Sequence, residues 1–251
     1  MIRTIFTTIV AVLVTIPCAL AVTVVALVRS TSPKIDRIIR FWARSIVRAG
    51  GIDLQIENAD LLDHDKRYIL VSNHYSYFDI PCILAVVPQP IRFMAKASLF
   101  KVPLFGGAMG RAGFIPIDRK NRSSAVKSFD LATKRIQQGN TIVIFPEEGR
   151  TSTRTLRPFQ RGAFLLALKS RLPIVPIAID GTHEVFPVGA KSIRPGRVTV
   201  RLGRPIEPTE FSVRDKGALA ARARGDIVTM LGIDDPAPAV VGPDSTPVAA
   251  K

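Results

Sequence analysis

Residues 68–79, YILVSNHYSYFD, join an apolar run to a polar turn that carries His74 and Asp79. The run 68–71 predicts a buried strand, and the apolar residues 80–87 predict a short helix after the turn. His74 and Asp79 are five residues apart, so on one continuous helix they would point about 140° away from each other. They meet only if the chain turns between strand and helix. Asp79 can then accept from one ring nitrogen and leave the other as a general base.

Two other interpretations of this stretch stay open at this point. His74 can be an ordinary loop histidine, with Asp79 as a helix N-cap. Ser76 can be the nucleophile of a serine hydrolase, with His74 and Asp79 as its partners. The chain has no G-x-S-x-G elbow, which a common class of such hydrolases requires. The choice among these interpretations depends on motifs elsewhere in the chain.

Strand-like runs alternate with helical segments over residues 51–233, which we predict to be one catalytic domain. We expect strands at 52–56, 68–71, 91–94, 113–117, 141–145, 174–179 and 197–202, and helices at 78–87, 123–138, 161–170 and within 213–231. This alternation predicts an α/β fold whose mixed, mostly parallel sheet is flanked by helices. Pro176 indicates an edge strand or the wall of an apolar groove. Residues 234–251 are rich in Pro, Ala and Val without periodicity, so we expect a disordered tail.

The first 33 residues predict a hydrophobic membrane anchor. Residues 5–28 carry no charge and are long enough to cross a bilayer, although Pro17 leaves a re-entrant course open. A signal peptide is the alternative, but the apolar run continues past the small residues 19–21 and exceeds the usual core of about 7–15 residues. More positive charges follow the run than precede it. The positive-inside rule therefore predicts an inner or cell membrane protein whose catalytic domain faces the cytoplasm.

Residues 34–50 predict a basic amphipathic helix on a membrane surface. Basic residues recur every three or four positions and form one stripe, at Lys34, Arg37, Arg40, Arg44 and Arg48. The opposite stripe is apolar and holds Ile38, Ile39, Trp42 and Ile46. Such helices bind anionic leaflets, and the formal net charge of +15 suits an anionic membrane surface as a partner. The alternative is that the apolar stripe packs on the protein's own core.

Two further strands end in charged turns. Arg119 follows the run 113–117, and its planar fork of donors suits a phosphate. The run 141–145 leads into Glu147 and Arg150, where the arginine suits an anionic headgroup and the glutamate can orient that arginine or a substrate hydroxyl. A solvated strand end and a local surface ion pair are the ordinary alternatives. The chain lacks zinc and aromatic-platform signatures, so we expect no metal and no nucleic-acid partner.

Together these motifs resemble the four motif blocks of the glycerophospholipid acyltransferases, most closely the bacterial lysophosphatidic acid acyltransferases. The blocks are Asn73-His74 with Asp79, residues 113–119, Phe145-Pro146-Glu147 with Arg150, and residues 173–176, and the similarity covers about residues 52–208. The resemblance implies that His74 is the catalytic base and Asp79 its orienter. The substrate-binding residues that it suggests are Asn73, Lys96, Arg119, Glu147, Gly149 and Arg150.

The resemblance implies transfer of an acyl chain from acyl-CoA or acyl carrier protein to the sn-2 hydroxyl of 1-acyl-sn-glycerol 3-phosphate, without a cofactor. One departure bears on the acceptor. The third block usually reads Phe-Pro-Glu-Gly-Thr-Arg-Ser, and here Glu148-Gly149 stands in place of Gly-Thr. A carboxylate has entered a turn that should face a phosphate, so another lysophospholipid or a lyso-aminolipid stays an alternative acceptor. A membrane-bound lipid hydrolase is the less favoured alternative.

Overall fold

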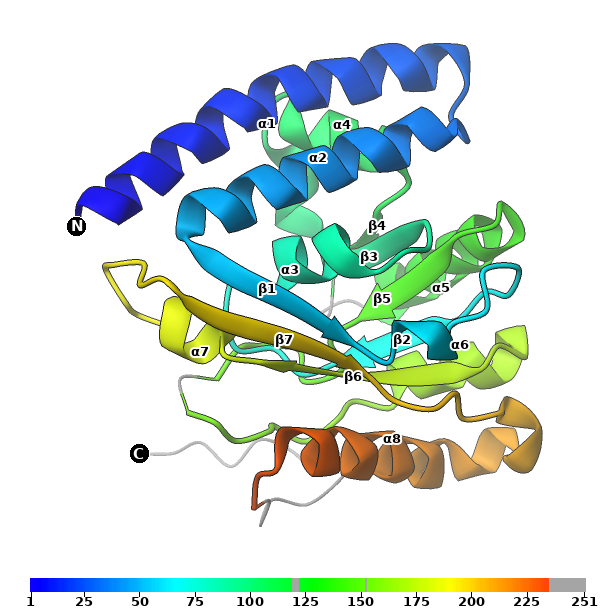
Figure 1. Ribbon diagram of the computed structural model, residues 1–251. Coiled ribbons are helices and arrows are strands. Elements are labelled where there is room, and N and C mark those ends of the chain that lie inside the picture. Colours follow the sequence, from blue (N-terminus) through cyan, green and yellow to red (C-terminus); the bar gives the residue numbers. More distant parts are fainter. Residues whose placement is uncertain (119–121, 152, 235–251) are drawn as a thin grey trace.

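The computed structural model describes residues 1–118, 122–151 and 153–234, and of residues 122–126 only the backbone. Arg119 and the tail beyond Asp234 lie outside the described residues, so the expectations for them stay predictions. Figure 1 shows a central sheet, with the helix pair α1 and α2 above it and helix α8 below it. The helices thus cover both faces of the sheet, which is the layered arrangement expected for an α/β domain.

Seven strands form the sheet, in the order β1-β7-β6-β2-β5-β3-β4. Their bounds are β1 Ile52–Glu57, β2 Ile69–Ser72, β3 Ile91–Lys96, β4 Ile115–Ile117, β5 Thr141–Ile144, β6 Ile174–Asp180 and β7 Gly196–Leu202. Only the β6–β7 pair is antiparallel among the described pairs. The predicted mixed, mostly parallel sheet is confirmed, and each predicted strand is present with shifts of one or two residues at its ends.

The helices of the α/β layer are α3 Asp79–Val86, α4 Phe105–Ala112, α5 Arg122–Gln137, α6 Gly162–Ser170, α7 Thr182–Val185 and α8 Lys216–Leu231. Sequence patterns did not predict α4, whose glycines have low helix propensity. Its formation depends on tertiary packing, because a Cβ at Gly106 would collide with the backbone carbonyl of Phe100. This glycine lets α4 lie directly on the preceding turn.

Pro176 does not mark an edge strand, which corrects the expectation from its sequence. It lies in β6, between β2 and β7 in the sheet. The Pro176 carbonyl accepts a hydrogen bond from the Gly203 amide at 2.8 Å, just beyond the end of β7. The nitrogen of Pro176 faces the same side as its carbonyl, as in any strand, so its missing N–H costs no hydrogen bond with β2.

The apolar side chains of the central strands alternate between two cores, one on each face of the sheet. In β2, Leu70 contributes to the core under α2 and α3, whereas Ile69 and Val71 contribute to the core over α6 and α8. Side chains of successive strand residues point to opposite faces, and all these residues are buried. A strand buried on both faces is what a continuous apolar run predicts.

Helices α1 (Ile2–Val28) and α2 (Pro33–Gly50) form a hairpin that lies against the domain (Figure 1). The turn ends at Ser32, whose side chain accepts from the Lys34 amide and caps α2. α1 continues through Pro17 and is long and apolar enough to cross a membrane by length and composition. Thr7 Oγ1 donates to the Ala49 carbonyl at 3.0 Å, which helps to hold the two helices together.

The apolar stripe of residues 34–50 packs on the protein's own core and not toward lipid, which corrects our expectation. Ile38, Ile39, Trp42 and Ile46 pack against the buried cluster because α1 folds back over α2. The exposed apolar surface of the helix pair is instead the outer face of α1. Its exposed apolar residues include Ile5, Phe6, Ile9, Val12, Leu13, Ile16, Leu20, Val24 and Leu27.

Candidate active site

His74 and Asp79 meet in the turn between β2 and α3, at the carboxyl end of the central strand. Asp79 Oδ2 lies 2.7 Å from His74 Nδ1. The same oxygen accepts from the backbone amides of Tyr75 and Ser76, at 2.7 and 2.9 Å. The Asp79 side chain is fully buried. The turn that the five-residue spacing required is confirmed, and the chain itself holds the carboxylate in place.

This geometry sets the tautomer of His74. An ionised carboxylate only accepts, so Nδ1 carries the proton and Nε2 keeps its lone pair. No described residue hydrogen-bonds Nε2. The His74 ring stacks on Phe145, with centroids 4.0 Å apart and an interplanar angle of 12°. The imidazole is therefore fixed on one face, oriented by Asp79, and open at the nitrogen that a general base uses.

Glu147 supports the His74 turn and is not open to a substrate. Its Oε1 accepts from the His74 amide at 2.7 Å, and its Oε2 accepts from the Arg157 amide at 2.7 Å. The residue is 2% exposed. Both oxygens are used by the backbone, which corrects the expectation that Glu147 binds the acceptor. Glu147 instead ties the histidine loop to the segment that follows the third motif.

Burial raises the pKa of Glu147 from 4.5 to about 7, against the lowering effect of the Arg157 and His74 amides. Desolvation disfavours the charged carboxylate, and two amide donors recover only part of that cost. With a pKa near 7, Glu147 changes its charge near neutral pH, next to the His74 turn.

Asn73 is also a structural residue, contrary to the substrate-binding role suggested by its motif. Its Nδ2 donates to the Ile179 carbonyl and its Oδ1 accepts from the Ile179 amide, both at 2.8 Å. Asn73 is fully buried. This pair of bonds joins the end of β2 to β6 and leaves Asn73 no exposed donor for a ligand.

Three cations remain at the same edge of the sheet. Arg150 lies over the Tyr77 ring, with 3.4 Å from its Cζ to the ring centroid, so it sits beside the histidine turn. Lys96 is exposed at the carboxyl end of β3. Arg157, which sequence reasoning missed, has its guanidinium against Gly149, where a Cβ would collide with it. Gly149 thus makes room for an arginine, and its suggested role in substrate binding stays a prediction. No sequence pattern pointed to Arg157, because it lies outside the motif.

Glu148, the residue that departs from the motif, has a left-handed backbone, with φ of 56°. Glycine adopts this conformation without penalty, whereas a residue with a Cβ pays about 1–2 kcal/mol. The usual motif has glycine at this position. The departure therefore changes the backbone energetics of the turn as well as its charge.

Ser76 is not arranged as a nucleophile. Its Oγ donates to the Phe186 carbonyl at 2.8 Å, and its amide donates to Asp79. Ser76 is fully buried. A serine nucleophile must hydrogen-bond its base, and here the hydroxyl is engaged by the backbone on the other side of the turn. This geometry disfavours the hydrolase alternative.

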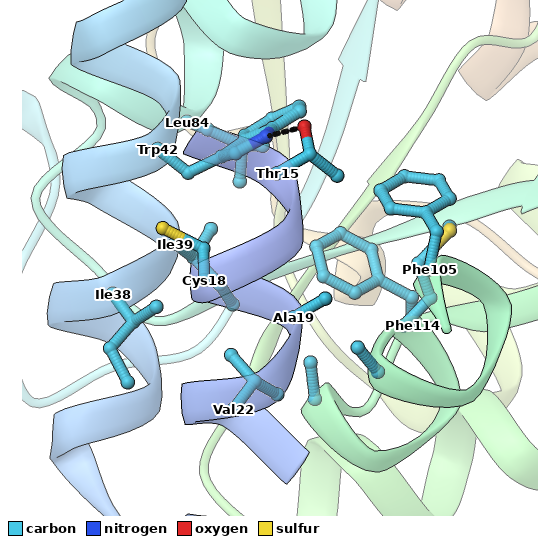
Figure 2. Close-up of a pocket in the computed structure, with 13 residues that line it drawn as sticks. Thr15, Cys18, Ala19, Val22, Ile38, Ile39, Trp42, Leu84, Phe105 and Phe114 are labelled. Atoms are coloured by element: carbon cyan, nitrogen blue, oxygen red, sulfur yellow. Dashed lines mark hydrogen bonds between the residues drawn. The ribbon is translucent and has the colours of Figure 1, made fainter. Parts of the chain in front are cut away.

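An apolar space runs along α1 from the turn that carries His74 and Asp79. A groove there is lined by Phe78, the neighbour of Asp79, and by Phe105, Val102 and Ala19 among others. An adjoining cavity of about 70 Å³ shares Thr15, Ala19 and Phe105 with it. Figure 2 shows that side chains of α1, α2 and α4 enclose this cavity, and that the Trp42 indole donates to Thr15 Oγ1, at 2.9 Å. The cavity lining is almost wholly apolar, so it suits a hydrocarbon chain.

Comparisons with known proteins identify the family of this chain and solved structures with a similar fold. A family model described as Acyltransferase matches residues 53–180, which include the histidine turn and the Glu147 turn. The chain belongs to the acyltransferase family. It is 31% identical over 207 residues to the 1-acyl-sn-glycerol-3-phosphate acyltransferase alpha of Ovis aries, covering 82% of this chain and 72% of that protein.

Other relatives of this acyltransferase family member are longer. It is 34% identical over 172 residues to the chloroplastic 1-acyl-sn-glycerol-3-phosphate acyltransferase BAT2 of Brassica napus, covering 67% of this chain and 49% of that protein. The chain thus spans about half the length of the plant relatives that it matches. Its fold is similar to the crystal structure of the LPA acyltransferase PlsC from Thermotoga maritima. The TM-score is 0.74 at 22% identity, over 88% of this chain and 92% of that one.

Proposed function

We propose that this protein transfers an acyl chain from a thioester donor to the sn-2 hydroxyl of 1-acyl-sn-glycerol 3-phosphate, giving phosphatidic acid. The observation that carries the proposal is the 2.7 Å contact between His74 Nδ1 and a buried Asp79 carboxylate. This contact leaves Nε2 open, which supports its role as the base, and the same edge of the sheet carries Arg150, Arg157, Lys96 and an apolar groove. The names of the curated relatives support the choice of acceptor.

In the proposed reaction the acceptor hydroxyl lies against His74 Nε2. The imidazole takes the hydroxyl proton as the oxygen attacks the thioester carbonyl, and Asp79 stabilises the imidazolium. Collapse of the tetrahedral intermediate breaks the C–S bond, and the imidazolium returns the proton to the leaving thiolate. General-base assistance contributes about 10²–10⁴ in rate. The remainder comes from holding both lipids in place.

We assign the acceptor phosphate to Arg150, supported by its position beside the histidine turn over Tyr77. Arg157 and Lys96 are exposed at the same edge and suit the charges of the acceptor or of an acidic donor. Arg119, suggested by the motif resemblance, stays a prediction for the same phosphate. Acyl-CoA and acyl carrier protein are both acidic, so the cationic edge is compatible with either donor.

The apolar cavity between α1, α2 and α4 is the place that we propose for an acyl chain. The groove begins at Phe78, beside Asp79, and the cavity continues from it along α1. A chain whose carbonyl lies at His74 can therefore extend between the hairpin and the domain. The depth of the cavity would then limit the chain length that the protein accepts.

We propose that α1 lies in one leaflet with its apolar outer face in the lipid. Near its start, Thr4 Oγ1 accepts from the Ile193 amide at 2.9 Å. Near its end, Val22 is buried in the core that the domain shares with the hairpin. Contacts at both ends hold α1 along the domain, so it cannot cross the bilayer without breaking one of them. The basic residues of the chain suit an anionic cytoplasmic leaflet.

An acyl-transfer assay with a panel of acceptors tests the proposal. Membranes that contain the protein are given long-chain acyl-CoA or acyl carrier protein with lysophosphatidic acid, other lysophospholipids or a lyso-aminolipid. We expect phosphatidic acid from lysophosphatidic acid as the fastest reaction. Faster transfer to a different acceptor would refute that substrate while keeping the chemistry. Release of free fatty acid without an acceptor would refute the transferase and support a hydrolase.

A further inference from the structure

Three arginines meet in a pocket at the opposite edge of the sheet from His74. Arg67 precedes β2, Arg92 lies at the start of β3, and Arg135 lies in the last turn of α5. They line a polar pocket of about 210 Å³, together with the α1–α2 turn. β3 runs parallel to β5, and β5 to β2, so the amino ends of these strands lie at one edge and His74 lies at the other.

All three arginines line this pocket, and two of their guanidinium groups, those of Arg92 and Arg135, lie close together. A Cβ at Gly113 would lie 3.1 Å from Arg92 Nε and 3.4 Å from Arg135 Nε, so these two groups flank one point. A Cβ at Gly139 would lie 3.7 Å from both Nε and Nη2 of Arg67. Gly113 and Gly139 both have a positive φ, and each ends a helix that leads into the pocket. The absence of side chains there opens the space in front of the guanidinium groups.

Positive charge in this pocket exceeds negative charge. Asp36 is the only carboxylate among the lining residues, and its Oδ1 pairs with Arg92 Nη1 at 2.6 Å. Arg135 donates to Gln138 and to the Gly110 carbonyl, and Arg67 donates to the carbonyls of His64 and Lys66. None of these acceptors except Asp36 is charged. Burial and the neighbouring Arg92 lower the pKa of Arg135, as expected for like charges held together out of water.

Each of the three arginines also has a buried Nε without a hydrogen-bond partner among the described residues. Arg92 is itself only 5% exposed. Buried donors are nearly always satisfied, and an unpaired one costs about 1–3 kcal/mol or more when it is charged. An anion in the pocket would offset the excess charge. The guanidinium fork suits the oxygens of a phosphate better than those of a neutral ligand.

We propose that this pocket binds a phosphate group, as a second anion site remote from the catalytic histidine. The ligand is either free inorganic phosphate or the phosphate of an anionic lipid. The pocket opens beside the α1–α2 turn, where Leu27 and Val28 at the end of α1 are exposed. A lipid whose chains lie along that end of α1 would have its headgroup at the depth of the arginines. A phosphate bound in this pocket would connect the α1–α2 turn to α5 and β3.

Binding measurements on the full chain in neutral detergent test this site. The probes are inorganic phosphate, dihexanoyl phosphatidylglycerol, and dihexanoyl phosphatidylcholine for comparison, each titrated by calorimetry. Arg135→Gln removes one guanidinium group. Lys134→Gln is the matched control, because Lys134 is the exposed neighbour of Arg135 and its replacement changes the net charge by the same amount. We expect at least tenfold weaker anion binding for Arg135→Gln and wild-type binding for Lys134→Gln. Arg67→Gln replaces Arg135→Gln if that protein fails to fold.

Asp36→Asn gives an opposite expectation that a folding defect cannot imitate. Loss of the only carboxylate should tighten anion binding by at least about fivefold. If inorganic phosphate binds, more weakly to Arg135→Gln and more tightly to Asp36→Asn, the site is assigned to free phosphate. If phosphatidylglycerol shows these variant effects and inorganic phosphate does not bind, the site is assigned to a lipid headgroup.

Three outcomes would overturn the proposal: no anion binding, binding that Arg135→Gln leaves unchanged, or binding that is lost in Arg150→Gln and therefore belongs to the catalytic edge. His74→Ala protein should bind as wild type does. Because these titrations involve no acyl transfer, their failure leaves the transferase proposal intact.

Discussion

The Glu147 carboxylate accepts a hydrogen bond from the backbone amide of His74, with 2.7 Å between Oε1 and N. The other oxygen holds the Arg157 amide at the same distance. A residue of the third motif thus holds the backbone of His74, the residue that we propose as the base. We therefore propose that Glu147 positions His74 through the histidine loop.

The first prediction concerns Glu147→Gln. Glutamine keeps one carbonyl oxygen and puts an amide donor against the second backbone N–H, so one of the two bonds is lost. We expect kcat to fall about tenfold to a hundredfold, since an unsatisfied buried group costs about 1–3 kcal/mol. The acceptor KM should stay nearly unchanged. Steady-state kinetics with exposed Glu210→Gln as control test this. A raised acceptor KM at constant kcat would restore the acceptor-binding role.

The second prediction is a pH dependence of stability. The Glu147 carboxyl titrates near 4.5 when unfolded and near 7 when folded. Between these values the folded state binds more protons, so the Glu147 contribution to the free energy of unfolding falls as pH rises from about 4.5 to 7. The full change is about 3 kcal/mol, at roughly 1.4 kcal/mol per pKa unit.

Denaturant unfolding of wild type and Glu147→Gln at several pH values tests this dependence. The stability of wild type relative to the variant should decrease across that window and stay constant above pH 7. A difference that is flat with pH, or that grows as pH rises, would contradict the raised pKa.

The third prediction concerns the left-handed Glu148. Glu148→Gly and Glu148→Ala both remove the carboxylate, but only glycine relieves the backbone at φ of 56°. We expect the glycine variant to be more stable than the alanine variant by about 1 kcal/mol. Thermal unfolding of the pair measures this difference. Equal stabilities would mean that the turn relaxes in solution and carries no strain.

The fourth prediction assigns the acceptor phosphate to Arg150. Arg150→Ala should raise the KM for lysophosphatidic acid about tenfold or more, because a hydrogen bond to a charged group contributes about 1.5–3 kcal/mol. The KM for the acyl donor should change little. Arg194→Ala, which removes an exposed arginine elsewhere, serves as the control. An effect confined to the donor KM would move Arg150 to the thioester side of the site.

The sequence predicted the strands of the sheet well because the central ones, such as β2 and β5, are bounded apolar runs buried on both faces, and β1 alternates apolar with polar residues. It failed where tertiary contacts decide the structure. The glycine-rich α4 forms by packing on the turn at Phe100, and Pro176 fits inside the sheet because β7 ends beside it. The stripe of residues 34–50 has the right pattern for a membrane surface, but α1 covers it.

Within the site, the sequence predicted the His74–Asp79 contact because their spacing allows it only across a turn. It did not separate ligand-binding residues from supporting ones. Asn73 and Glu147 lie in motifs, and their polar atoms are used by backbone groups that are 106 and 73 residues away. Such partners depend on how the strands are ordered in the sheet. Arg157 was missed because it lies outside the motifs, and the loop after the third motif brings it back to Gly149.

The most direct test of the account is acyl transfer to lysophosphatidic acid by His74→Ala, measured beside His64→Ala, which changes an exposed loop histidine. Both proteins should fold and associate with membranes as wild type does. We expect His64→Ala to keep wild-type activity and His74→Ala to lose at least about 10²–10⁴ in kcat. Wild-type turnover in folded His74→Ala would contradict the assignment of His74 as the base, and with it the mechanism proposed for this acyltransferase family member.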